Sequence, residues 1–327
     1  MPGGFGRNSF VGWAEEGAGT WGTGVAATKF AELGSESMKI IRERKPRPVY
    51  RGLIDGREGQ LYDEKQGAAG SFAIEGNYNG LLKLFEHAFG DSSGVVTVAE
   101  GGIRWLTTYS LAQTIMSTKG LSLHINTDVD NGATPQRRYN GFKINTLKFT
   151  FDPKRNLLLE VGGAAKDHSD IAAVSPTFPA IANYVAGHQC VVSLDTVATK
   201  VDAVELSIDN GLDLDKRILG DKRIDEPIRS DNQVKMEGQI TKDAVAADMT
   251  KFRDGTLFRL DVVCTGPTLG AGNNKLSLIA LKCLVTDDPY NVTGPGIVKS
   301  KFPFKVLEPV SGQALQLLIE NNESAIA

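Results

Sequence analysis

A strong charge of either sign is missing from this sequence, and so are long apolar runs. The 327 residues carry a net charge of -3 with a pI near 5.9, which gives no basic field to hold nucleic acid or an anionic membrane. No apolar run approaches the roughly 18 residues that a membrane-spanning helix needs. The first ten residues lack the charged and apolar regions of a secretory signal. We therefore expect a protein that is made in the cytosol and has no membrane partner.

Cysteine is scarce. Cys190, Cys264 and Cys283 lie far apart, and none belongs to a CxxC motif or has a histidine beside it. Free cysteine is among the residue types most often found in protein cores. The sequence therefore predicts three buried free thiols.

Catalytic and cofactor signatures are lacking too. The four histidines form no HxH or HxxxH pair, and neither a GxSxG elbow nor a GxxxxGK[ST] loop occurs. Gly17, Gly19 and Gly22 spell GxGxxG, but Glu15 and Glu16 stand before them in place of a buried strand. Their charge would repel a pyrophosphate, which argues against a dinucleotide site. We expect no enzyme, no cofactor and no metal.

What is present is a strand that runs directly into a short amphipathic helix, at Gly70–Gly90. Phe72 and Ile74 alternate with polar or small residues, the period of a half-buried strand, and apolar residues at helical spacing follow. The predicted core stripe of this helix consists of Leu81, Leu84, Phe85, Ala88 and Phe89. His87 falls outside that stripe.

The same plan occurs again at Val234–Gly255. An alternating strand is followed by a second predicted helix, whose core stripe consists of Val245, Met249 and Phe252. Two copies of one strand-helix unit indicate two copies of one domain. The many strands with one helix per copy favour a mainly β fold, with two tandem β-sandwich or half-barrel modules that each carry one flanking α-helix.

This duplication divides the chain into five parts. We expect an N-terminal arm at 1–24, a first module at 25–170, a linker at 171–187, a second module at 188–309 and a C-terminal tail at 310–327. The arm is glycine-rich and holds Phe5, Phe10, Trp13 and Trp21; the tail holds Leu315, Leu317 and Ile319. These apolar residues are expected to dock on another surface.

Several further strands are predicted from alternation, and two segments are less regular. The strands are expected at Ser35–Ile41, Val95–Thr108, Leu121–Asn126, Phe142–Phe151 and Leu157–Gly162. Val25–Leu33 has a pattern that suits a helix. The charged segment from Arg42 to Gln66 is broken by proline and glycine, and its charges nearly balance, which favours a solvated or subunit-bridging loop or hairpin over a nucleic-acid site.

Four short stretches carry a resemblance to a known family. They are GWAEEGAGTWGT at Gly12–Thr23, the SES of Ser35–Ser37, the unit at Gly70–Gly90, and VELSIDNG from Val204 onward. In their order and spacing they resemble the tail tube proteins of long-tailed bacteriophages, in the class where one chain carries two tube modules.

The resemblance implies a structural virion protein. Six modules form a ring whose inner sheets join into one barrel, so three chains would suffice, and rings stack into a hollow tail tube. The implied partners are further copies of the chain, a tape measure protein inside the tube, and tail tip or baseplate and terminator proteins. DNA passes without specific binding, and assembly takes place in the host cytoplasm. The arm and the tail are the expected stacking elements.

Carboxylates on the strand faces suggest how such a tube would treat DNA. Glu75, Glu205, Asp209 and Glu237 alternate with apolar positions and are candidates to face the lumen, where they would repel phosphates close to the wall.

Three other interpretations are compatible with the sequence: a tandem β-sandwich binding module on a virion or cell surface, the tube of a contractile injection device, and an enzyme of unknown class.

Overall fold

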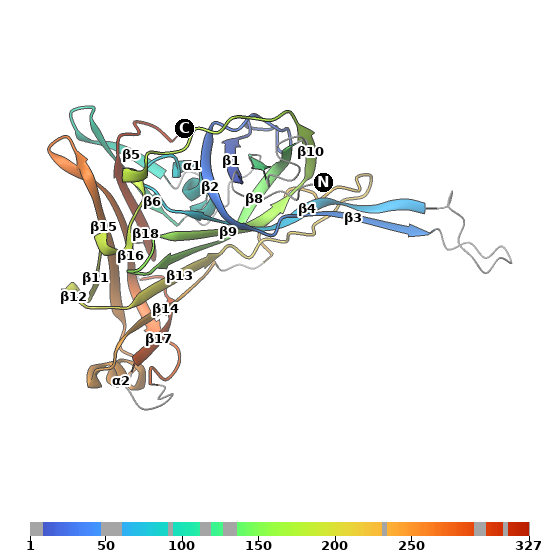
Figure 1. Cartoon of the computed structure of the whole chain (residues 1–327). Coiled ribbons are helices and arrows are strands. Elements are labelled where there is room, and N and C mark those ends of the chain that lie inside the picture. Colours follow the sequence, from blue (N-terminus) through green and yellow to red (C-terminus); the bar gives the residue numbers. More distant parts are fainter. Residues whose placement is uncertain are drawn as a thin grey trace, which may run out of the picture.

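The structure, a computed structural model, is mainly β, as the sequence predicts (Figure 1). It describes residues 9–46, 61–90, 94–111, 119–126, 136–230, 234–290, 299–309 and 313–326. Within these ranges there are eighteen strands and two α-helices. The strands form a small N-terminal sheet and a large continuous sheet, and nearly all pairings are antiparallel.

The N-terminal sheet is centred on β1 (Phe10–Glu15), which lies between β2 (Lys29–Glu36) and β7 (Leu121–Asn126). The first half of β8 (Gln136–Phe151) and β10 (Asp167–Ile171) complete it. The predicted arm therefore contributes Phe10–Glu15 to this sheet as a strand.

The central part of the large sheet runs through both halves of the chain. Its order is β3-β4-β9-β8-β13-β14-β17-β16. Besides β8, these strands are β3 (Lys39–Pro46), β4 (Leu61–Glu75), β9 (Leu158–Ala165), β13 (Ala203–Asp209), β14 (Lys235–Asp243), β17 (Lys299–Val306) and β16 (Gly272–Val285). The β8–β13 pairing is the seam at which the two halves become one sheet.

The central part of the large sheet forms one wall of the molecule, and a second wall continues from β16. On one side β16 pairs with β15 (Phe258–Leu269), and on the other with β18 (Leu315–Asn321), which in turn pairs with β6 (Arg104–Ser110). The outer strands of this wall are β5 (Gly94–Glu100), β11 (Cys190–Leu194) and β12 (Val197–Ala198). The predicted tail thus contributes a strand inside its own chain.

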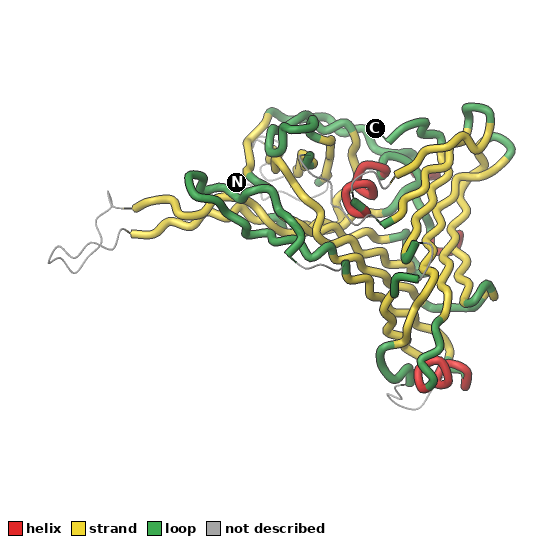
Figure 2. The backbone as a smooth tube through the Cα atoms, turned by 180° about the vertical axis from the view of Figure 1, so that it is seen from behind, coloured by secondary structure: helices red, strands yellow, loops and turns green. Residues whose placement is uncertain are grey.

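Helix α1 (Leu82–Phe89) lies in the angle between the two walls of the sheet (Figure 2). All five residues of its predicted stripe are buried, as expected. Phe85 stacks on Phe149 of β8 with 5.9 Å between ring centres, and the Tyr109 hydroxyl donates a hydrogen bond of 2.9 Å to the Leu82 carbonyl oxygen. His87 is also buried, contrary to the sequence pattern, because β1 covers that side of the helix with Glu15.

Helix α2 (Ala246–Arg253) lies at the far end of the second half and is less enclosed (Figure 2). Met249 and Phe252 are half-buried, but Val245 precedes the helix and is 50% exposed, so it does not belong to a core stripe. The buried group on this helix is the Asp248 carboxylate. It accepts hydrogen bonds of 2.8 Å from the Lys242 ammonium at both oxygens.

Three local predictions were wrong. Val25–Leu33 is not a helix, because its second half belongs to β2, which pairs with β1 and β4. Ser35–Ile41 is divided between β2 and β3 at a corner where the Ser37 amide donates to the Ser71 carbonyl oxygen. Val95–Thr108 is a hairpin, since Gly101 and Gly102 take positive φ angles and turn the chain between β5 and β6.

The prediction of three free thiols was also wrong. Cys190 of β11 and Cys264 of β15 lie directly opposite each other and form a disulfide. The pairing cannot be predicted from the sequence, because the two cysteines are far apart along the chain and come together only through the register of β11 and β15. Cys283 is free and buried, as predicted.

Candidate functional site

One side of the central sheet is polar and carries all four predicted acids. The register places Glu75, Leu158, Thr150, Glu205 and Gln239 in one row across β4, β9, β8, β13 and β14. Asp209 and Glu237 lie an even number of residues from members of this row along β13 and β14, and so share its side. We call this side the polar face.

The other side of the same strands is closed. Its side chains are Phe72, Ile74, Leu147, Phe149, Leu159, Val161, Val204, Leu206, Ile208, Met236, Ile240 and Phe304, and all are buried. These residues form the core on which α1 packs. The polar face is therefore the side of the central sheet that can face solvent or a channel.

Charges on the polar face are mixed, and in the rows around Glu75 and Glu205 carboxylates outnumber ammonium groups. Glu75, Glu160, Glu205, Asp209 and Glu237 give five carboxylates, against three ammonium groups from Lys148, Lys235 and Lys305. Toward α2 the next rows add Asp243, Lys299 and Lys301, which brings the balance to six against five. The excess of negative charge therefore lies over the middle of the sheet.

The two acids of the first row, Glu205 and Glu75, each have a polar partner. The Lys148 ammonium lies 2.8 Å from the Glu205 carboxylate, across the β8–β13 seam. The Asn156 amide donates a hydrogen bond of 2.7 Å to Glu75. Both pairs are partly exposed, so each leaves carboxylate oxygens open to solvent.

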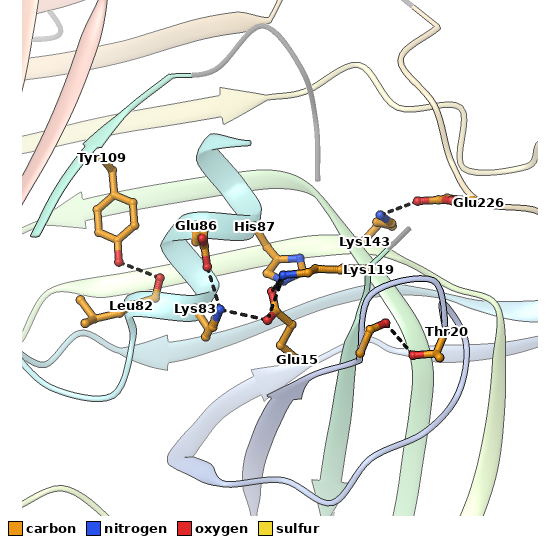
Figure 3. Close-up of polar contacts among 11 residues, drawn as sticks. Glu15, Thr20, Leu82, Lys83, Glu86, His87, Tyr109, Lys119, Lys143 and Glu226 are labelled. Atoms are coloured by element: carbon orange, nitrogen blue, oxygen red, sulfur yellow. Dashed lines mark hydrogen bonds and ion pairs between the residues drawn. The ribbon is translucent and has the colours of Figure 1, made fainter. Parts of the chain in front are cut away.

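A second polar cluster joins the N-terminal sheet to α1 (Figure 3). Glu15 of β1 accepts a hydrogen bond of 3.0 Å from Lys83, which also lies 3.0 Å from Glu86, and Lys119 lies 3.5 Å from Glu15. His87 Nε2 lies 3.3 Å from the other Glu15 oxygen. Each charged group of the cluster faces an opposite charge, which suits a structural clasp between β1 and α1.

The protonation of this cluster follows from its surroundings. Burial by itself would raise the pKa of Glu15, but hydrogen bonds from His87 and Lys83 outweigh it and lower the pKa to about 2. Burial lowers the pKa of His87 from its ordinary value, and this exceeds the opposing effect of Glu15. At neutral pH the cluster therefore holds a charged Glu15 and a neutral His87.

A cleft of about 450 Å³ opens beside the polar face. It is lined by Glu32, Glu75, Asn156, Phe178, Pro179, Ile181, Ala182, Tyr184, Ala186 and Gln189. Carboxylates, amides and apolar groups line it together, without a nucleophile and base in contact. Over the ranges that the structure describes, no cluster of His, Cys, Asp and Glu suits a metal ion, and no helix has the length and apolarity to cross a membrane.

Comparison with known families decides what kind of protein presents this face. A family model described as phage tail tube protein matches residues 6–306, nearly the whole chain. The chain belongs to the phage tail tube protein family. A search of curated proteins found no match. Membership makes the chain a structural component of the virion tail that assembles with itself into a tube, which agrees with its β-rich fold.

The apolar residues predicted for ring stacking in this tail tube protein lie mainly inside the chain. Phe10 and Trp13 are buried in β1, and Trp21 is half-buried with its indole N–H donating to the Gly141 carbonyl oxygen at 3.0 Å. Phe5 lies outside the described residues. The tail residues Leu315, Leu317 and Ile319 are buried in β18. In a single chain these six described side chains therefore stabilise the fold.

Sequence reasoning missed other members of the polar face. Glu160 and Lys305 each lie opposite a polar-face residue on the neighbouring strand, Lys148 and Glu237 respectively. Alternation along β9 and β17 gives the signal for both residues. Their place in one surface with Glu75 and Glu205 follows only from the register.

Proposed function

We propose that three copies of this chain form a ring, and that rings stack into a tube through which phage DNA passes, with the polar face as the channel wall. One observation carries the proposal: the four acids share the side of a continuous sheet that the α1 core leaves open. Closing such sheets into a barrel would pair strand edges that are otherwise aggregation sites.

The stoichiometry of three rests on an internal duplication of the tube module. In each half an antiparallel strand pair, β3-β4 or β13-β14, is followed by one helix and then by a hairpin, β5-β6 or β15-β16. In each half the second strand of the first pair is also bound by a late strand, β9 or β17. Two such modules per chain give six per ring from three chains.

The mechanism is electrostatic and mechanical. At physiological salt the Debye length is about 8 Å, so the carboxylates of the polar face would repel only phosphates that come close to the wall. Ammonium groups alone would instead bind DNA through counterion release and hold it. A wall of mixed charge, with a small excess of carboxylates over its middle rows, would keep DNA centred without binding it tightly.

The partners of the tube follow from the same proposal. Copies of the chain contact one another within and between rings, a heterologous contact that continues until a different protein stops it. A tape measure protein would occupy the channel before DNA, and tail tip or baseplate and terminator proteins would cap the ends. We place assembly in the host cytoplasm.

Negative-stain microscopy of purified protein over a range of concentrations tests assembly. Rings or hollow tubes are the expected result. A monodisperse monomer that never polymerises, and that does not enter tails when supplied during infection, would overturn the proposal.

The channel wall is tested by neutralising its acids in assembled tails. Glu75→Gln, Glu205→Gln, Asp209→Asn and Glu237→Gln together are expected to slow DNA ejection while tubes stay intact. A matched control neutralises Asp170, Asp254, Asp287 and Glu308, four exposed acids outside the polar face. Equal ejection rates in wild-type and polar-face variants would contradict the assignment of the wall.

A further inference from the structure

The connection between β13 and β14 folds back onto the first half of the chain. At Gln66 of β4 the backbone makes a parallel bridge to Arg223: the Gln66 amide donates to the Lys222 carbonyl oxygen at 2.9 Å, and the Ile224 amide donates to the Gln66 carbonyl oxygen at 3.2 Å. The pairing of β4 with β9 ends at Ala68, just before this point. We call residues 211–230 the strap. Through the backbone of Lys222–Ile224, the strap binds the edge of β4 that β9 leaves free.

An apolar anchor fixes the strap at the same place. Ile224 is 1% exposed and packs over Gly67 of β4. A Cβ atom on Gly67 would lie 2.5 Å from Ile224 Cδ1, closer than carbon atoms approach without displacement. The absence of a side chain at position 67 is thus what makes room for the anchor.

Ion pairs extend the contact to three strands. Asp215 of the strap lies 3.0 Å from Lys65 of β4, and Arg223 lies 2.8 Å from Asp167 of β10. Glu226 lies 2.8 Å from the Lys143 ammonium of β8, a side chain that is 4% exposed. Because the Lys143 ammonium is buried, losing its carboxylate partner would destabilise the folded chain. Of the three ion pairs, this one therefore depends most on the position of the strap.

The contact lies at the root of a projecting hairpin. Strands β3 and β4 extend away from the body of the molecule in both views (Figures 1 and 2). A two-stranded hairpin is barely stable by itself, so its direction depends on what holds its base. The strap joins β13 to β14 in the second half of the chain, and so corresponds to the connection between β3 and β4 in the first half. It packs against the β3–β4 pair.

We propose that the strap is a clamp that sets the direction of the β3–β4 hairpin, and that tube assembly requires the clamp although folding does not. The inference rests on the proposed function, since it assigns the clamp to assembly. Gly67 and Ile224 are its positioning residues. The other party in the affected contact is a second copy of this chain.

A pair of substitutions tests the anchor. Gly67→Ala is expected to displace Ile224 and release the strap, whereas Gly67→Ala combined with Ile224→Ala makes room for the new methyl group and restores the contact in part. Ile228→Ala is the matched control, because Ile228 lies on the same strap and is 51% exposed. Hydrogen exchange at the Gln66 and Ile224 amides reports the clamp, and microscopy with light scattering reports tubes.

We expect Gly67→Ala to raise exchange at these two amides by roughly tenfold, the effect of losing about one buried hydrogen bond, and to reduce tube formation, with the thermal transition retained. The double variant recovers assembly in part, and Ile228→Ala behaves as wild type. If the wild type forms tubes and a Gly67→Ala chain with a released strap assembles equally well, the clamp proposal is overturned and the proposed function is not. Failure of the wild type to form tubes would instead overturn the proposed function.

Discussion

The Lys148 ammonium and the Glu205 carboxylate meet at 2.8 Å across the seam that joins the two halves of the sheet. Both side chains are more than a third exposed, and such pairs contribute little to stability because water screens them. The seam is held instead by the opposite side of the same strands, where Phe149 and Leu206 are cross-strand neighbours and are buried.

Replacing members of this seam should separate charge from packing. Lys148→Met is expected to change the free energy of unfolding by less than about 1 kcal/mol. Phe149→Ala, one residue along on the buried side, is expected to cost about 3–5 kcal/mol because it leaves a cavity beside Phe85. Urea unfolding of the unassembled chain measures both, and a similar cost for the two variants would contradict the division of roles.

The buried pair under α2 should behave in the opposite way. Lys242 and Asp248 are 5% and 4% exposed, so Asp248→Asn leaves an ammonium group buried without a charged partner and is expected to cost about 3–5 kcal/mol. Lys242→Met combined with Asp248→Leu removes both charges and should recover most of this loss. Asp243→Asn, in the exposed pair with Lys299, is the control and should leave the urea midpoint unchanged.

Local periodicity was enough to predict the parts of this fold that depend on neighbouring residues. The helix stripe of Leu84, Phe85 and Phe89 was correct, because residues three and four apart share one helical face wherever the helix packs. The alternation of polar and apolar residues along β13 was also predictable, because successive side chains of a strand point to opposite faces of the sheet. The burial of His87 was not predictable, because the strand that covers it comes from residues more than seventy positions earlier.

Register and long-range pairing were not predictable from the residues alone. In the sequence the strap is a charged segment in which acidic and basic residues are interspersed, without an apolar stripe. Its role depends on Ile224 meeting a glycine 157 positions earlier, a contact that no local pattern encodes. The apolar residues of the tail predict docking on another surface, but alternation at Leu315 and Leu317 fits an interior strand equally well, and both are buried in β18.

Acid should weaken the fold in two stages. His87 has a lowered pKa in the folded chain, so below its ordinary value of 6.5 the unfolded chain binds the proton more readily and stability falls. Glu15 is held at a pKa of about 2 against an ordinary 4.5, so its contribution is present above pH 4.5 and is lost as the pH falls toward 2.

The Glu15 part of this loss should be of the order of 1–2 kcal/mol, after allowing for partial screening. Urea midpoints between pH 7.5 and 2.5 measure both stages. Glu15→Gln should flatten the curve below pH 4.5, and His87→Gln should flatten it between pH 6.5 and 5. A wild-type curve that rises on acidification across either window would contradict these assignments.

The disulfide between Cys190 and Cys264 should stabilise the chain mainly by restricting its unfolded state. The bond closes a loop across 74 positions, for which chain entropy gives about 4 kcal/mol. Cys283 should not react in the folded chain, because burial raises its pKa to about 12. Thiol titration of protein purified without reductant should therefore find no reactive thiol when folded, one when denatured and three after reduction.

Cys190→Ala combined with Cys264→Ala should still fold, since β11 keeps its five paired positions with β15, but at a lower urea midpoint. Cys283→Ala, the control, should leave no thiol in the denatured unreduced chain and keep the disulfide. Three thiols in denatured wild-type protein that was never reduced would show that the bond does not form. In that case the double variant and the wild type should unfold at nearly the same urea concentration, which makes the two measurements a check on each other.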